Sequence, residues 1–166
     1  MRGNPGGYAV EAQAVASEFI SSGTVYIEQD ANGKNTNITV DSSQPHTNLP
    51  LVVLVDHNSA SSSEIVAGAL QDSGRGKIVG QATFGTGTVL QKFDLADGSV
   101  IFLGTAYWLT PSGHKIFGVG IKPDESVALA AGVVPIDPTT LGTMTTAQLN
   151  SSGDAELLAA VKDLTK

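Results

Sequence analysis

The chain has no cysteine and little charge of either sign. The absence of cysteine among its 166 residues excludes disulfide bonds, thiolate metal sites and a cysteine nucleophile. Nine lysines and arginines face sixteen acidic residues, for a net charge of −7, which argues against nucleic-acid binding because phosphates need clustered basic side chains. No apolar run approaches the roughly 20 residues of a membrane span. Three scattered histidines give no metal-binding spacing, so we expect neither a metal nor a cofactor.

The residues that are present alternate between helical and strand-like patterns. In chain order, the predicted elements are a helix over 8–20, a hairpin over 24–28 and 37–40, a buried strand over 51–55, a helix over 62–71, a strand over 77–80, a second hairpin over 88–95 and 99–106, a short strand around 116, an irregular connector over 135–146 and a helix over 154–164. The strand, helix and strand over 51–80 form a βαβ unit with parallel strands. We predict an α/β fold with a partly parallel sheet and a β-rich second half.

The most informative segment is LVVLVDHNSASSSEIVAGAL, from Leu51 to Leu70. An apolar strand stops at a loop of small polar residues, and a helix begins with serines. This arrangement exposes a hydroxyl beside the backbone amides of a helix N-terminus, which can hold a negative oxygen, and so favours a serine hydrolase. Ser61 and Glu64 also fit the S-x-x-E capping box, which involves no chemistry. The G-x-S-x-G elbow of the α/β-hydrolases is absent.

Several segments in a fixed order carry a family resemblance. RGNPGGYAVEAQAVASEFISSGTV, SASSSEIVAGALQDSGRGKIVG, TFGTGTVLQ, LADGS, WLTPSGHKI and GVGIKPD follow one another between about residues 2 and 124. Together they resemble the core of the carboxyl-terminal processing, or tail-specific, proteases. The resemblance implies a ClpP/crotonase-like fold and a serine endopeptidase that uses a serine–lysine dyad to cut proteins near apolar C-termini. It also implies a protein or peptide substrate, an extracytoplasmic location and a PDZ domain in the parent protein.

The same segments suggest how the chain is divided. We expect a protease-like core over 1–134, and a connector with a C-terminal helix packing on that core over 135–166. The loop motif at residues 2–7 has no element before it, which suggests a core truncated at its N-terminus. A truncated core leaves a sheet edge exposed, and such an edge favours a homodimer.

The resemblance assigns roles to individual residues. It places the nucleophile on Ser61 and the oxyanion donors on the backbone amides of Gly6 or Gly7 and of Ser62. An ordinary Pro-Gly turn is the alternative explanation for the two glycines. The family's acid falls on Asp72, which we expect to support the site rather than to transfer protons.

Three further side chains near these motifs need an explanation. An aspartate near a helix C-terminus is disfavoured by the helix dipole, so Asp72 needs a partner, with Arg75 as a candidate. Tyr107 and Trp108 could line an apolar substrate groove, but core or strand-face packing is the simpler explanation.

The chain departs from the family at its general base. The family's lysine, 25 residues after the serine, is Thr86 here, and the glutamine that hydrogen-bonds that lysine falls on Leu90. Gln91 is one residue further, on the opposite strand face unless a bulge intervenes. Because threonine cannot act as a base near neutral pH, we expect little activity unless another base is recruited. The first to test is His57, four residues before Ser61, although an exposed loop histidine is the simpler explanation. The other candidates are His114, Lys77, Lys92 and Lys115.

Three hypotheses of different classes follow. The chain is a tail-specific endopeptidase with an unconventional or weak base. Alternatively, it is an inactive module that binds peptides or apolar ligands on the same fold, as the retinoid-binding repeats that resemble this core do. The third hypothesis is a truncated enzyme whose site is incomplete.

Overall fold

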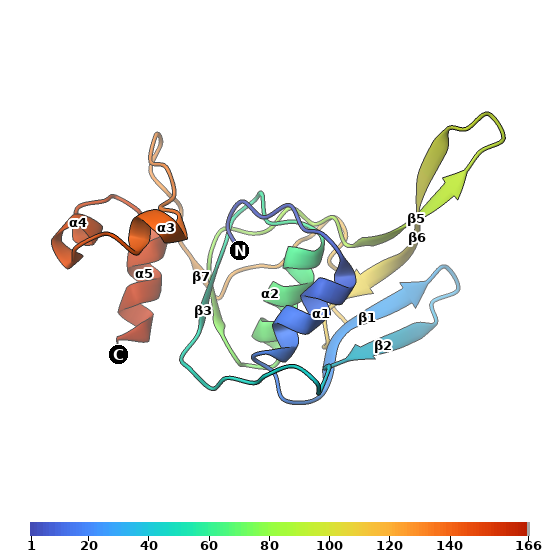
Figure 1. Ribbon diagram of the computed structural model, residues 1–166, viewed down its shortest axis with the longest axis horizontal. Coiled ribbons are helices and arrows are strands. Elements are labelled where there is room, and N and C mark those ends of the chain that lie inside the picture. The colour runs from blue at the N-terminus through green and yellow to red at the C-terminus, as the bar shows by residue number, and fades with distance from the viewer. Residues whose placement is uncertain (166) are drawn as a thin grey trace.

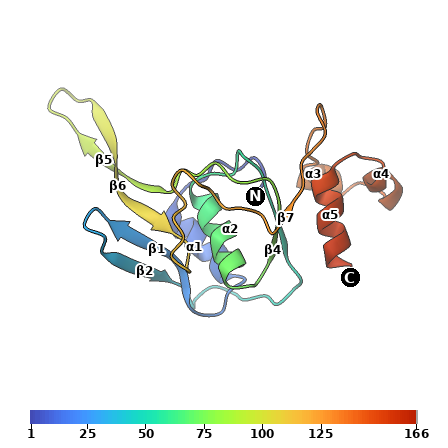
Figure 2. The same cartoon turned by 180° about the vertical axis from the view of Figure 1, so that it is seen from behind.

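In the computed structural model, which describes residues 1–165, two β-sheets lie on either side of a central pair of helices. Helices α1 (Ala9–Ser17) and α2 (Ser62–Asp72) pack against each other between the sheets (Figures 1 and 2). Almost all of α2 is buried, from Ser62 to Leu70. Small residues allow this close packing: a Cβ on Gly68 would lie 3.0 Å from Thr110 and 3.1 Å from Ile121.

The parallel sheet confirms the predicted βαβ unit. Its strands run in the order β3 (Val52–Val55), β4 (Lys77–Gly80) and β7 (Glu125–Ser126), and α2 connects β3 to β4. Val55 pairs in parallel with Gly80, so the ends of both strands lie at the same edge. The loop that carries the serine cluster leaves this edge.

The second sheet is antiparallel and contains both predicted hairpins. Its order is β2 (Asn35–Thr39), β1 (Thr24–Asp30), β6 (Val100–Leu109) and β5 (Thr88–Asp94). The β5–β6 hairpin projects away from the rest of the molecule (Figures 1 and 2). The strand predicted around Ile116 is reduced to an isolated bridge between Leu109 and Lys115.

The C-terminal segment adds three helices. The connector expected to be irregular over 135–146 contains α3 (Pro138–Leu141), capped by Asp137, and α4 (Thr146–Asn150), capped by Thr145, begins at its last residue. Helix α5 (Ala155–Leu164) packs on β3 and β4, on the side away from α2 (Figure 1). Within the described part of the chain, no helix is both long and apolar enough to cross a bilayer.

Candidate active site

Ser61 occupies a strained turn directly before α2. Its φ and ψ are 58° and −123°, and it is the only non-glycine residue with positive φ among residues 1–165. Such a conformation costs about 1–3 kcal/mol, and residues that keep it cluster at functional sites. Ser61 is half-buried, whereas Ser62 and Ser63 are buried in the first turn of the helix. The turn therefore presents Ser61 at the surface and withdraws its neighbours.

A buried carboxylate holds Ser61 beside position 86. Glu64 is fully buried, and its Oε2 accepts hydrogen bonds from the backbone N–H groups of Ser61 (2.8 Å) and Thr86 (3.0 Å). Its Oε1 accepts from the Thr83 hydroxyl (2.6 Å) and from the Gly85 N–H (2.7 Å). The glutamate of the predicted capping box thus fixes the serine turn and also the loop that follows β4. Because the amides of Ser61 and Thr86 share one oxygen, the structure brings these two positions together.

The Pro-Gly-Gly turn lies directly against the serine. Gly6 has a φ of 100°, and a Cβ there would lie 2.6 Å from both the Ala60 carbonyl oxygen and the Ser61 Cβ, so this approach requires glycine. Gly7 has more room, since its Cβ would meet only the Ser62 Oγ, at 3.9 Å. The Gly6 N–H donates to the Asn4 side chain at 2.9 Å, so this amide is already used within the turn.

Asp56, at the end of β3, fastens the turn on one side. Its carboxylate accepts hydrogen bonds from the Gly3 N–H (3.0 Å), the Asn58 N–H (3.0 Å) and the Ser59 hydroxyl (3.1 Å). Burial raises the pKa of Asp56, but these hydrogen bonds outweigh burial and hold the pKa below its ordinary value. The parallel sheet is thereby joined to the segment that enters the Pro-Gly-Gly turn.

A buried ion triad fastens the turn on the other side. Arg2 binds Asp154 through two parallel hydrogen bonds of 2.8 and 2.9 Å, and it reaches Glu156 at 3.1 Å. The side chains of Arg2, Asp154 and Glu156 are 9%, 0% and 1% exposed. Burial raises the pKa of Asp154, but the Arg2 guanidinium and the N–H groups of Ile136 and Leu157 hold it below its ordinary value. Helix α5 therefore anchors the beginning of the chain.

Position 86 lies beside an open hollow, and none of the described residues that line this hollow is a lysine. The hollow has a volume of about 540 Å³, and its lining residues are Gly3, Pro5, Asn58, Ala60, Phe84 and Thr86. Phe84 is 70% exposed and gives the hollow an apolar wall. The lining can accept an apolar side chain of a ligand, but it offers no side chain that could remove a proton at neutral pH.

The structure places Leu90 and Gln91 on opposite faces of β5. The antiparallel register shifts where Val89 pairs with Ala106 and Leu90 with Gly104, so the extra residue, Thr105, lies on β6. A bulge on the partner strand leaves the alternation along β5 intact. Gln91 is exposed, and the bulge does not turn it to the face of Leu90.

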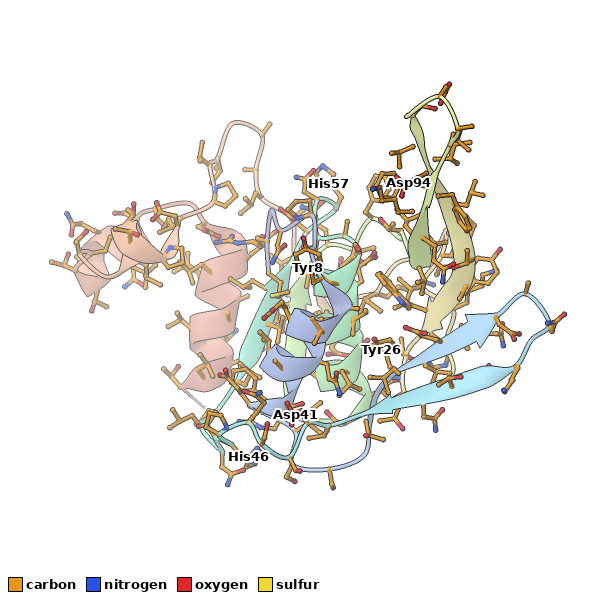
Figure 3. The ribbon with its side chains drawn as sticks, turned by 45° about the vertical axis from the view of Figure 1, so that its right-hand side comes forward. Tyr8, Tyr26, Asp41, His46, His57 and Asp94 are labelled. Carbon is orange, nitrogen blue, oxygen red and sulfur yellow. The ribbon has the colours of Figure 1, made fainter. Side chains whose placement is uncertain are left out.

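Both histidines considered as replacement bases are exposed. His57 lies on the loop after β3, and its side chain is directed outward at the rim of the molecule (Figure 3). His114 lies in the turn after β6. The interpretation of His57 as an exposed loop residue agrees with this position.

Two of the three candidate lysines are paired with carboxylates. Lys77 binds Glu125 and lies 2.6 Å from Asp163, and these hydrogen bonds raise the pKa of its ammonium. A raised pKa makes an amine a poorer base at neutral pH. Lys92 pairs with Asp94 at 2.9 Å on the projecting hairpin.

The third lysine lies among aromatic rings. The Lys115 ammonium is 3.7 Å from the centroid of the Tyr107 ring and 5.5 Å from that of Phe117. Tyr107 and Phe117 line a second hollow, next to β5. Trp108 belongs to the core instead, where it is 6% exposed and packs edge-on against Tyr26.

The expected pairing of Asp72 with Arg75 is wrong. Asp72 accepts a hydrogen bond from the Ser112 N–H at 2.7 Å and so connects α2 to the turn after β6. The Arg75 guanidinium instead donates to the carbonyl oxygens of Phe19, Thr47 and Leu49. Planar guanidinium groups satisfy several carbonyls at once, and here the group holds three loop carbonyls together.

Sequence reasoning missed the anchoring residues. The capping box identified Glu64 only as a cap, because nothing in the pattern S-x-x-E reveals the second loop that shares its carboxylate. Arg2, Asp154 and Glu156 went unnoticed because more than 150 residues separate the partners. The available signal was an arginine two residues before the Asn of Asn-Pro-Gly-Gly, in a chain with few basic residues.

Comparison with known proteins identifies the class to which this fold and site belong. The model of peptidase family S41 matches residues 1–127, and the chain belongs to this family. A carboxyl-terminal-processing protease of Synechocystis sp. is 39% identical over 127 residues, which cover 76% of this chain and 30% of that protein. The corresponding protease of Picosynechococcus sp. is 37% identical over all 166 residues and 37% of its own length.

A solved structure agrees with these relatives. The photosystem II D1 C-terminal processing protease superimposes with a TM-score of 0.79 and 34% identity, over 94% of this chain and 39% of that one. A putative S41 protease of Bacteroides fragilis shares the fold, with a TM-score of 0.70 at 17% identity over 99% of this chain and 43% of that one. The chain thus spans about a third of the length of the curated relatives it matches.

Proposed function

We propose that this chain is the catalytic core of a serine endopeptidase of the C-terminal processing type, with Ser61 as the acyl-forming nucleophile. The observation that carries the proposal is the strained turn of Ser61, packed against Gly6 at the mouth of α2. A serine held in this way presents its hydroxyl beside the amides of a helix N-terminus, where charge develops during acyl transfer.

The surrounding amides suggest which donors stabilise the tetrahedral intermediate. Ser61 attacks the scissile carbonyl carbon, and the carbonyl oxygen becomes an oxyanion. Because the Gly6 N–H donates to Asn4, we assign the two donors to the backbone N–H groups of Gly7 and Ser62. Removing one donor of this kind costs about 10²–10³ in kcat in a well-studied serine protease.

The missing amine at position 86 sets the expected rate. Loss of the nucleophile or its base costs on the order of 10⁶ in kcat and leaves roughly 10³–10⁴ over the uncatalysed reaction. Thr86 lies where the family has its lysine, and the side chains lining the adjacent hollow supply no replacement. We therefore propose weak hydrolysis of peptides with apolar C-termini, with Phe84 as part of the apolar contact surface.

A serine-directed fluorophosphonate probe tests the nucleophile. We expect slow labelling that disappears in Ser61→Ala and persists in the matched control Ser73→Ala, an exposed serine at the other end of α2. Labelling that survives in Ser61→Ala would show that the probe reacts elsewhere and would remove the basis of the proposal.

Restoring the family residues tests the base. The double substitution Thr86→Lys with Leu90→Gln should raise peptide hydrolysis by about 10²–10⁶-fold, from the usual contribution of a positioned base up to the full cost of its loss. If the native chain is never labelled but the double variant is labelled, the native chain is the second candidate, an inactive peptide-binding module. Thr86 in place of the family's lysine and the exposed Phe84 favour that candidate. An inert double variant would contradict the placement of both residues.

Two proposals concern the whole protein. From the family resemblance we propose a PDZ domain in the part of the protein outside this chain and a location outside the cytoplasm. Cell fractionation with an antibody against this domain tests the location, and recovery in the cytoplasmic fraction would refute it.

A further inference from the structure

The projecting β5–β6 hairpin carries an unusual amount of exposed apolar surface. Seven of its large apolar side chains are between 40% and 63% exposed: Leu90, Phe93, Leu95, Val100, Ile101, Phe102 and Leu103. The hairpin stands clear of the rest of the described chain in both views (Figures 1 and 2). Contiguous exposed apolar side chains of this extent mark an interaction surface.

The outer strand of this hairpin is an open sheet edge. β5 is the last strand in the order β2-β1-β6-β5, and it contains no proline. At the turn, the Leu95 N–H donates to the Ser99 carbonyl, so the backbone of Leu95 faces β6. Because this direction alternates along an antiparallel strand, the N–H and C=O groups of Lys92 and Asp94 face the open edge. An unblocked edge of this kind is a template for another strand.

The charges on β5 indicate which strand pairs with its open edge. We propose that a second copy of this chain pairs antiparallel along β5, about a twofold axis at Phe93. This register places Lys92 of each copy opposite Asp94 of the other, and both residues offer outward-facing backbone groups for the ladder. The neighbouring registers that also use these outward-facing backbone groups place Lys92 opposite Lys92, or Asp94 opposite Asp94, of the second copy. Like charges directly opposite each other are unfavourable. In the single chain the Lys92 ammonium and the Asp94 carboxylate are 2.9 Å apart and largely exposed, so both remain accessible to the second copy.

Pairing in this register also covers apolar surface. The partners of β5 in β6 put Phe93 and Ile101 on one face of the hairpin, together with Leu103. The twofold axis brings the two Phe93 side chains side by side on this face. Two four-stranded sheets thereby join into one continuous sheet, and an isologous interface of this kind closes on itself without forming fibres.

Cysteine trapping tests the register, because the chain has no cysteine of its own. In Phe93→Cys, the two Cα atoms across the axis would lie about 4.5 Å apart, a distance that a disulfide accepts. In the matched control Gln91→Cys, the two sites are four residues out of register, about 14 Å apart. We expect a disulfide-linked dimer from Phe93→Cys under mild oxidation and none from Gln91→Cys. Equal cross-linking of both variants, or of neither, overturns the proposal.

A charge exchange provides a test that leaves Phe93 in place. Lys92→Asp alone and Asp94→Lys alone each oppose like charges at two symmetric sites, and each should weaken dimerisation in sedimentation equilibrium by about tenfold. The double exchange K92D/D94K restores both opposite-charge pairs and should restore the dimer. All three variants should keep the native circular dichroism spectrum, because these side chains are exposed. A native chain that stays monomeric up to its solubility limit, or a double exchange no better than the single ones, refutes the pairing.

Discussion

Replacing Glu64 by glutamine should both destabilise the protein and loosen its site. The carboxylate accepts four hydrogen bonds, two on each oxygen, and all four partners are donors. A glutamine side chain of nearly the same shape has one oxygen and one NH₂ group. With the NH₂ group at the Oε2 position, it faces the N–H groups of Ser61 and Thr86 and satisfies neither. With the NH₂ group at the Oε1 position, the Thr83 hydroxyl can accept instead of donate, and only the Gly85 N–H loses its acceptor.

The size of the effect follows from this mismatch. One or two hydrogen bonds to a buried charged group are lost, depending on the orientation, and each contributes about 1.5–3 kcal/mol, so unfolding should become easier by at least about 1.5–3 kcal/mol. With Oε2 replaced, the amides of Ser61 and Thr86 lose their common acceptor. A total stability of roughly 5–15 kcal/mol makes this loss a large fraction of the whole.

Urea unfolding followed by circular dichroism measures the change. Glu64→Gln should lower the urea midpoint strongly without changing the slope, whereas the matched control Glu11→Gln, on an exposed position of α1, should leave the midpoint within error. Fluorophosphonate labelling of Ser61 should also fall in Glu64→Gln and not in the control. A loss below about 1 kcal/mol, within the range of a single ordinary hydrogen bond, would refute the assigned network.

Three more predictions concern the turn and its anchors. Gly6→Ala should abolish labelling of Ser61 and lower stability, because the new Cβ would lie 2.6 Å from the Ser61 Cβ. The control Gly7→Ala should keep a thermal unfolding midpoint much closer to that of the native chain. Equal effects of the two substitutions in thermal melts would contradict this packing. The pKa of Asp154 is depressed in the folded state, so the stabilisation by this carboxylate is complete above about pH 4 and is lost as the pH falls through the folded-state pKa. Asp154→Asn should therefore be less stable at pH 7, and its urea midpoint should fall less steeply with decreasing pH than that of the native chain. An unchanged dependence of the midpoint on acid pH would speak against this assignment. Arg2→Lys keeps the charge but loses the paired hydrogen bonds, so it should lower stability by about 1–3 kcal/mol in the same assay, and a neutral result would count against the bidentate geometry.

The local patterns predicted most of the fold. The apolar run at Leu51 and the Asn32-Gly33 pair, which forms the turn between β1 and β2, contain their own signals, because strand burial and turn geometry act on neighbouring residues. The family resemblance, carried by motifs in a fixed order, identified the family and the relevant loops. The structure then brought the turns of Gly6, Ser61 and Thr86 together, which no local pattern could establish.

What escaped prediction depends on contacts between distant residues. Asp72 was expected to need a partner, and it has one, but the choice between Arg75 and the Ser112 amide is made by the packing of α2 against the turn after β6. The side of β6 that carries the bulge is likewise fixed by the fit between two strands. Pattern reasoning named the possibility of a bulge without being able to say which strand would carry it.

The triad of Arg2, Asp154 and Glu156 also sets an order of events during synthesis. Asp154 lies 152 residues after Arg2, so the ribosome makes this carboxylate only after every strand of both sheets has been synthesised. The growing chain therefore contains the Ser61 loop well before it contains the carboxylates that bind Arg2 next to the Pro-Gly-Gly turn. Maturation of the site is tied in this way to completion of the C-terminal helix.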